Sequence, residues 1–202
     1  MSSPSLKKKS SSTRQPETLD ALLKLLQIEQ WDLLLIGDGS GSNWNFECGW
    51  GCISIEQDTM KRRCWHGAMN LGTVNLAEML AYLQPLSWYL QQERRRQEKG
   101  APIQPRHIHI LTDSQYVQLR GKDRTFRPQK SNPLWQVFRQ FGAFGMVLHW
   151  HWIPRETVDL NTFADKLSKA ARLNLKGKDL QTQVEEKGYR PARSVYDINP
   201  YE

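Results

Sequence analysis

The stretch that decides the fold covers residues 33–41 and reads Leu33-Leu34-Leu35-Ile36-Gly37-Asp38-Gly39-Ser40-Gly41. A short, continuous apolar run closed by glycine is typical of a buried central strand. Asp38 follows this run, and Asp113 follows a second run at residues 107–112. Because open α/β sheets place ligands beyond the carboxyl ends of their strands, the two aspartates predict a polar site at that end of an α/β domain.

Two further acids fall in helical patterns. Glu78 lies one turn into a helix opened by Gly72-Thr73, with Thr73 as the expected N-cap. Asp165 lies near the start of the last strong helix. Asn161 precedes Asp165 by four residues, so the two side chains share one helical face.

Each of these acids has an ordinary interpretation when taken alone. An aspartate after a strand is often a turn residue, and an acid in a first helical turn often complements the helix dipole on the surface. Four together are less ordinary, because they repel one another unless a cation holds them. Paired Mg²⁺ or Mn²⁺ ions stabilise both the attacking and the leaving oxygen of a phosphodiester, and they need about this many carboxylates.

The remaining pattern predicts a mixed five-stranded sheet flanked by helices. Three meandering strands precede two strand-helix-strand crossovers, which are right-handed between parallel strands, so strands one and four become neighbours and bring Asp38 beside Asp113. The helix that carries Glu78 is predicted to kink at Pro85, which cannot donate an interior hydrogen bond. The expected strands cover residues 31–38, 48–56, 61–69, 107–112 and 146–153. The expected helices begin near residues 73, 114 and 132, and the last one lies around Asp165.

An ordered set of motifs resembles type 1 ribonuclease H. The likeness covers about residues 31–173, in that family's order and roughly its spacing. The motifs are Asp38-Gly39-Ser40, Asn75-Leu76-Ala77-Glu78, Thr112-Asp113-Ser114-Gln115-Tyr116-Val117, Asn132-Pro133-Leu134-Trp135, Trp150-His151-Trp152-Ile153-Pro154-Arg155-Glu156 and Asn161-Thr162-Phe163-Ala164-Asp165.

The resemblance implies an RNase H-like fold and a two-metal-ion endonuclease that hydrolyses the RNA strand of RNA–DNA hybrids and leaves 5′-phosphate ends. It implies two Mg²⁺ ions, for which Mn²⁺ can substitute, held by Asp38, Glu78, Asp113 and Asp165. It also implies contacts with the nucleic acid from Gly39, Ser40, Thr73, Asn75, Gln115, Arg155 and Asn161.

Details of the motifs separate this family from others with the same fold. Proofreading-type exonucleases carry a glutamate where this chain has Ser40, and transposases usually close the site with a glutamate where it has Asp165. The loop at residues 153–158 lacks the glycine-histidine pair of the best-known bacterial members, and Val74 stands where asparagine is frequent. The alternatives left open are a DNA nuclease or Holliday-junction-type resolvase on the same fold, and a binding module that no longer cuts.

Length and charge fit one domain with extensions. The 202 residues carry 28 Lys and Arg against 21 Asp and Glu, a formal charge of +7 that favours a polyanionic partner. We expect a basic disordered tail over residues 1–17, a short amphipathic helix over 18–30, the catalytic domain over 31–173 and a C-terminal extension over 174–202. No stretch has the length of a membrane span, and we expect a cytoplasmic monomer.

The cysteines and histidines are expected to be structural. Cys48, Cys52 and Cys64 are an odd number with no secretory signal, so reduced thiols are expected. Cys52 and Cys64 could face each other across a hairpin, but no paired short-spacing motif predicts zinc. His107, His109, His149 and His151 alternate along strands, which favours sheet-face residues over metal ligands. Trp135, Trp150 and Trp152 are expected in the core.

Overall fold

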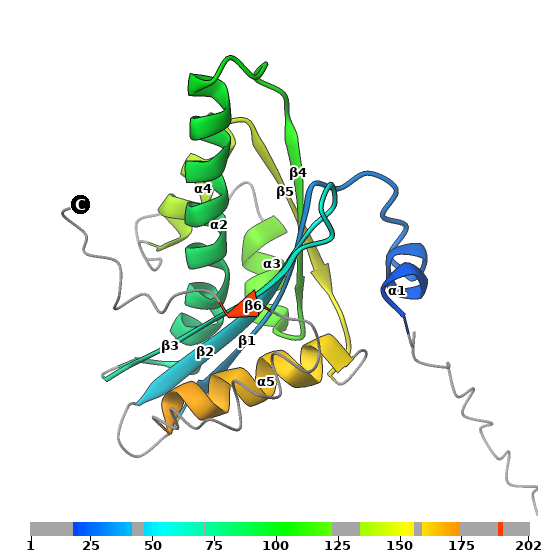
Figure 1. The fold of residues 1–202 in the computed structure, drawn as a ribbon. Helices are drawn as coiled ribbons and strands as arrows, with labels where there is room; N and C mark the ends of the chain where they lie inside the picture. The colour runs from blue at the N-terminus through cyan, green and yellow to red at the C-terminus, as the bar shows by residue number, and fades with distance from the viewer. Residues whose placement is uncertain are drawn as a thin grey trace, which may run out of the picture.

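The computed structural model describes residues 18–41, 47–70, 72–122, 134–155, 159–173 and 190–191 (Figure 1). The predicted tail over residues 1–17 and nearly all of the predicted C-terminal extension lie outside these described residues. The helices are α1 (Leu19–Leu25), α2 (Val74–Glu98), α3 (Gln115–Lys122), α4 (Leu134–Ala143) and α5 (Asp159–Arg172). The strands are β1 (Leu33–Gly41), β2 (Cys48–Glu56), β3 (Arg62–Met69), β4 (Arg106–Thr112), β5 (Met146–Trp152) and β6 (Arg190–Pro191).

The strands form one mixed sheet in the order β5-β4-β1-β2-β3-β6. β1 pairs antiparallel with β2 and parallel with β4, while β4 pairs parallel with β5. The predicted five-stranded sheet and the predicted neighbours, strands one and four, are therefore confirmed. The two-residue β6 adds a short parallel pairing on the outer side of β3.

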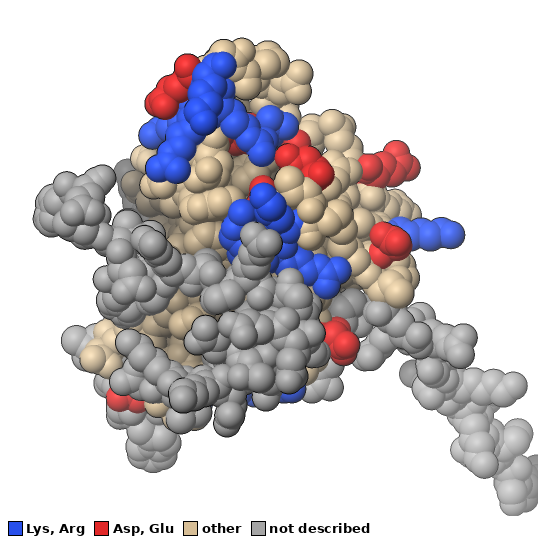
Figure 2. Space-filling model, viewed as in Figure 1, with Lys and Arg blue, Asp and Glu red and all other residues tan. Residues whose placement is uncertain are grey.

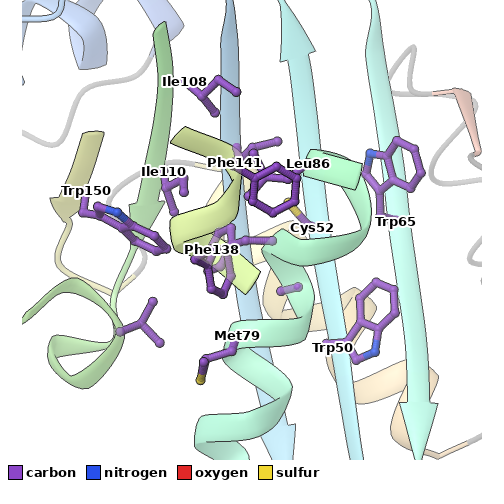
Figure 3. Close-up of a cluster of buried hydrophobic side chains, with 14 of the residues drawn as sticks. Trp50, Cys52, Trp65, Met79, Leu86, Ile108, Ile110, Phe138, Phe141 and Trp150 are labelled. Atoms are coloured by element: carbon purple, nitrogen blue, oxygen red, sulfur yellow. The ribbon is translucent and has the colours of Figure 1, made fainter. Parts of the chain in front are cut away.

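Two hydrophobic cores cover the two faces of this sheet. On one face, side chains from α2, α3 and α4 pack against the sheet, and Figure 3 shows Phe138 of α4 in the same cluster as Ile110 of β4 and Trp150 of β5. On the other face, Leu22 of α1 and Phe163 of α5 pack against the apolar residues of β1. The sheet is thus covered on both sides, which agrees with the continuous apolar run of its central strand.

Close approach of two helices to the sheet depends on glycine. A side chain at Gly39 would place its Cβ 2.4 Å from the backbone nitrogen of Glu78 in α2. On the opposite face, a Cβ at Gly51 would lie 2.5 Å from the Cβ of Leu167 in α5. Both distances are too short for real atoms, so these glycines allow α2 and α5 to lie directly on the strands.

Three expectations from the sequence need correction. β1 does not end at Asp38 but runs to Gly41, because residues 39–41 continue the antiparallel pairing with β2. Cys52 and Cys64 do not face each other: Cys64 pairs in register with Ile53, and the two thiols belong to the cores on opposite faces. Trp152 is 42% exposed, so it is not a core residue, whereas Trp135 and Trp150 are buried as expected.

Among the helices that the structure describes, none combines the length and the apolar character needed to cross a bilayer. The longest, α2, continues through Pro85 to Glu98 and carries Arg95 and Arg96 in its last turn.

Candidate active site

Three of the predicted acids meet at the carboxyl ends of β1 and β4. Asp38 comes from β1, Glu78 from the second turn of α2, and Asp113 directly follows β4. One carboxylate oxygen from each lies within 4.8 Å of the other two. Asp38 is 3% exposed, and the other two are partly buried. Such a group of oxygens has the composition of a site for a hard divalent cation.

The position of these acids follows from where the strand pairing ends. The parallel ladder between β1 and β4 closes with Ile36 opposite Leu111. Asp38 and Asp113 both lie two residues beyond that last pair, so both acids stand past the end of the parallel pairing. Gly39 has no side chain to hold Glu78 away, and this brings the α2 carboxylate between the two strand ends.

One buried tyrosine ties α2 to both strands. The hydroxyl of Tyr82, four residues after Glu78, lies 2.8 Å from the carbonyl oxygen of Gly37 and 2.9 Å from that of Leu111. These carbonyls immediately precede Asp38 and Thr112 at the ends of β1 and β4. Nothing in the sequence pattern singled out this tyrosine, because its partners are 45 and 29 residues away.

Burial and mutual repulsion shift the acids toward their neutral forms. Burial, and then the charges of Asp113 and Asp165, raise the pKa of Asp38 well above its ordinary value. Burial raises the pKa of Glu78 to about 6, although a hydrogen bond with Ser114 acts in the opposite direction. The largest cause of both shifts is burial, which disfavours the charged form of a carboxylate.

Several oxygens at the site have no hydrogen-bond partner. Among the described residues, Asp38 Oδ1, Glu78 Oε2 and Asn161 Oδ1 are buried without one. A buried oxygen without a partner costs free energy, on the order of 1–3 kcal/mol. Asp38 and Glu78 therefore fit a site that a cation completes.

Asp165 does not belong to the group of three acids that lie within 4.8 Å of one another, but its side chain forms a hydrogen bond with that of Asp38. It belongs to α5, and its Oδ2 accepts a hydrogen bond of 2.6 Å from Lys169 Nζ one turn later. Both its charge and its hydrogen bond with Asp38 contribute to the raised pKa of Asp38. Asn161, one turn before it, is 2% exposed. The structure thus places Asp165 near Asp38, with its carboxylate engaged by a lysine.

Asp113 is held by the last residue of β5, Trp152, and by Arg155, three residues further along the chain. The indole nitrogen of Trp152 donates to the backbone carbonyl of Asp113 over 3.0 Å. Nε of Arg155 donates to Asp113 Oδ2 over 3.2 Å, and this arginine side chain is 74% exposed. The sequence pointed to Arg155 but not to Trp152, whose exposure and hydrogen bond place it at the rim of the site.

The remaining predicted contact residues lie within a few residues of the three acids in the sequence. Thr73 caps α2, with its hydroxyl accepting from the Leu76 amide over 3.2 Å. Asn75 is exposed in the first turn of α2, and Gln115 is exposed at the first residue of α3. Ser40 is 8% exposed in β1. Helix starts and a strand end therefore bring these polar groups to one side of the molecule.

The fold is similar to that of solved RNase H structures. LC11-RNase H1, isolated from compost by a metagenomic approach, is 16% identical, with a TM-score of 0.52; the match covers 73% of this chain and 100% of that one. The chain has the RNase H fold. At this identity the likeness shows the RNase H fold alone.

Two further structures with the RNase H fold have lower scores. The N-terminal RNase H domain of Rv2228c from Mycobacterium tuberculosis, solved as a fusion with maltose binding protein, is 22% identical, covering 69% of this chain and 98% of that one, with a TM-score of 0.48. LC11-RNase H1 in complex with an RNA/DNA hybrid is 18% identical. This match covers 72% of this chain and 99% of that one, with a TM-score of 0.48. No protein-family model matches the chain, and no curated protein matches it.

Proposed function

We propose that this protein is a divalent-metal-dependent endonuclease that hydrolyses the RNA strand of RNA–DNA hybrids. The observation that carries the proposal is the meeting of Asp38, Glu78 and Asp113 within 4.8 Å on an RNase H fold. The raised pKa values of Asp38 and Glu78 support it, because they indicate carboxylates arranged at a cost that a cation would relieve.

The residues present fit Mg²⁺, with Mn²⁺ as a substitute. Asp38, Glu78 and Asp113 would hold two such ions together with Asp165, once Asp165 exchanges Lys169 for the metal. Oxygen ligands and buried, unpartnered carboxylate atoms are what a hard cation requires. When bound, the ions supply activation of a water and stabilisation of charge on the phosphodiester oxygens, giving 3′-hydroxyl and 5′-phosphate ends.

The chain's own groups position the strand that is cut. Trp152 fixes the backbone of Asp113, and Arg155 brings a positive charge beside its carboxylate, where a phosphate would lie. Asn75 and Gln115 present amides on the exposed rim, suited to base edges and to the 2′-hydroxyl that distinguishes RNA from DNA. Ser40, Thr73 and Asn161 are proposed to complete these contacts.

Positive charge supports a nucleic-acid partner. The formal charge is +7, and the exposed Arg94, Arg95 and Lys99 stand at the end of α2. Figure 2 shows Lys and Arg side chains gathered at that end of the molecule. Basic groups release counterions from a polyanion on binding, so affinity for a hybrid is expected to fall steeply with added salt.

A single assay tests the proposal. Labelled RNA–DNA, DNA–DNA and RNA–RNA duplexes of one sequence are incubated with the protein and Mg²⁺, with the Asp113→Asn variant as the control for contaminating nucleases. We expect cleavage of the RNA strand of the hybrid only, and no cleavage by the variant. Equal cleavage of the DNA duplex would assign the chain to DNA nucleases or resolvases, and binding without cleavage would assign it to non-cutting modules.

A further inference from the structure

Four histidines stand together on one face of β4 and β5, on the side of the sheet opposite Ile108 and Ile110. His109 is opposite His149 in the register of the two parallel strands. Their rings lie within 15° of parallel at a centroid distance of 4.4 Å. His107 and His151 extend this row at either end, with centroid distances of 5.4 Å to His149 and 5.1 Å to His109. The sequence predicted the sheet-face placement but not the contacts between the rings.

The nitrogens of this histidine row meet in two pairs. Nδ1 of His107 lies 3.1 Å from Nε2 of His149, and Nδ1 of His109 lies 2.9 Å from Nε2 of His151. Each contact is a hydrogen bond between one protonated and one unprotonated ring nitrogen. The lone pair of the unprotonated nitrogen could bind a metal ion in place of the proton.

The tautomer of His109 is fixed by its second nitrogen. Nε2 of His109 lies 3.0 Å from the backbone carbonyl oxygen of Gln30, which can only accept. Nε2 therefore carries the proton, and Nδ1 offers its lone pair toward His151. A ring nitrogen that donates to a backbone carbonyl while the other faces a metal is the usual arrangement of metal-binding histidine. His109 is 6% exposed, so this orientation is enforced by its surroundings.

The His109–His151 pair has nearly the spacing of two metal ligands. Two imidazole nitrogens at about 2.0–2.1 Å from a tetrahedral ion are about 3.4 Å apart, so the observed 2.9 Å has to open by about 0.5 Å. His151 is partly exposed and lies on β5, the outermost strand on its side of the sheet. An ion can therefore reach the pair from solvent.

We propose that His109 and His151 bind a transition-metal ion of the Zn²⁺, Co²⁺ or Cu²⁺ class through Nδ1 and Nε2, respectively, at a site separate from the carboxylates. Imidazole suits these ions, whereas Mg²⁺ prefers oxygen. On binding, neutral His151 moves its ring proton from Nε2 to Nδ1, so no proton has to leave the protein. The parallel rings do not direct a third nitrogen to the same point, and water completes the coordination. The site does not depend on the proposed nuclease function.

The experiment is a titration of the full chain with Co²⁺ and then Zn²⁺, in excess Mg²⁺ to occupy the carboxylates. Co²⁺ binding is followed by visible absorption, and displacement by Zn²⁺ is followed by loss of that signal. We expect one ion per chain, with affinity at least about tenfold weaker in His151→Gln, because a lost ligand costs more than the 10–100-fold typical of an outer-shell partner.

Matched variants make the result decisive. His66→Gln makes the same substitution on β3, outside the row, and should leave the affinity unchanged. Asp113→Asn, which alters the carboxylates, should also retain the Co²⁺ signal. Circular dichroism verifies that His151→Gln is folded. Absence of binding to the wild-type chain at millimolar Co²⁺ overturns the proposal, as does equal affinity in His151→Gln or loss of the signal in Asp113→Asn.

Discussion

The carboxylates and the histidine row are two clusters of titratable groups on neighbouring strands, and burial drives both toward the uncharged state. Burial raises the pKa of Asp38 and Glu78. Burial, followed by the neighbouring imidazoles, lowers the pKa of His109 and His151 to about 4. The same physical cause thus acts in opposite directions on acids and bases.

The consequence for metal binding differs between the two clusters. A protonated carboxyl group is a poor ligand, so the acids must lose a proton before a cation can bind them. A neutral imidazole already carries its lone pair, so the histidine row is ready to bind at neutral pH. One strand, β4, therefore leads to the proposed site for a hard ion at its end and carries the proposed site for a softer ion on its face.

The largest expected effect concerns cleavage. Asp38→Asn should lower the hybrid cleavage rate in Mg²⁺ by more than about a hundredfold, because loss of a direct ligand exceeds the usual cost of losing an outer-shell partner. Asp20→Asn changes an exposed carboxylate in α1 and should cleave at the wild-type rate. The measurement is single-turnover cleavage of labelled hybrid. A near wild-type rate in Asp38→Asn would remove Asp38 from the metal site.

A second prediction concerns the close contact between Gly39 of β1 and Glu78 of α2, which has no counterpart in the histidine row. Gly39→Ala should destabilise the fold by about 1–3 kcal/mol, the usual cost of forcing an extra methyl group into a packed site, because its Cβ would meet the α2 backbone at 2.4 Å. The matched control is Gly142→Ala in α4, where an added Cβ meets no atom within 4 Å. Urea denaturation compares the two. Equal stability of the variants would show that α2 can shift freely.

The two clusters should change the free energy of unfolding in opposite directions as the pH rises. In metal-free protein, the raised pKa of Glu78 gives stability that is lost as pH rises from about 4.5 to about 6, and Asp38 extends the loss to higher pH. The lowered pKa of His109 and His151 gives stability that is present above about 6.5 and lost as pH falls toward 4. The wild-type profile should therefore be flatter than either contribution.

Single variants separate these contributions. Asp38→Asn should be more stable than wild type at pH 8 without metal, by several degrees in Tm, since about 1 kcal/mol corresponds to about 2–4 °C in a chain of this length. His151→Gln should lose less stability on acidification from pH 6.5 to 4. Thermal unfolding at intervals of pH, in chelator, provides the measurement. Parallel profiles for all three proteins would contradict the opposed pKa shifts.

The smallest expected effect is at the rim. Trp152→Phe keeps an aromatic ring but removes the hydrogen bond to the Asp113 carbonyl. A hydrogen bond contributes about 1 kcal/mol, so the Mg²⁺ concentration for half-maximal cleavage should rise about fivefold, while Co²⁺ binding to the histidine row stays the same. Mg²⁺ titrations of cleavage rate test this. An unchanged Mg²⁺ requirement would show that the bond does not position Asp113.

What the sequence could predict was local pattern and strand order. Asp38 and Asp113 were placed correctly at one end of the sheet, because an apolar run followed by an acid is visible in the chain. The side-chain alternation of β5 could not predict that Trp150 is buried while Trp152 is exposed. Trp150 and Trp152 share a face, yet Trp150 packs against Gly121 and Phe138 while Trp152 lies beyond the covering helices at the strand's end.

Contacts between segments far apart in the sequence could not be predicted from sequence patterns. The carbonyl of Gln30 fixes the tautomer of His109 across 79 residues of sequence. The engagement of Asp165 by Lys169 was within reach, since the two lie four apart on one helix. Lys169 competes with any cation for the carboxylate of Asp165. The motif of four acids does not include this lysine, so a prediction made from the motif alone misses the competition.

Tyr82 connects α2 to the ends of β1 and β4, the two strands that lead to Asp38 and Asp113. Its hydroxyl has one proton for two carbonyl oxygens, at 2.8 and 2.9 Å, so the ends of β1 and β4 share a single donor. The parallel pairing of the two strands ends with Ile36 opposite Leu111. Beyond that pair, the hydroxyl of Tyr82 links the two strand ends through α2, so a tilt of α2 would change the distance between the carboxylates of Asp38 and Asp113.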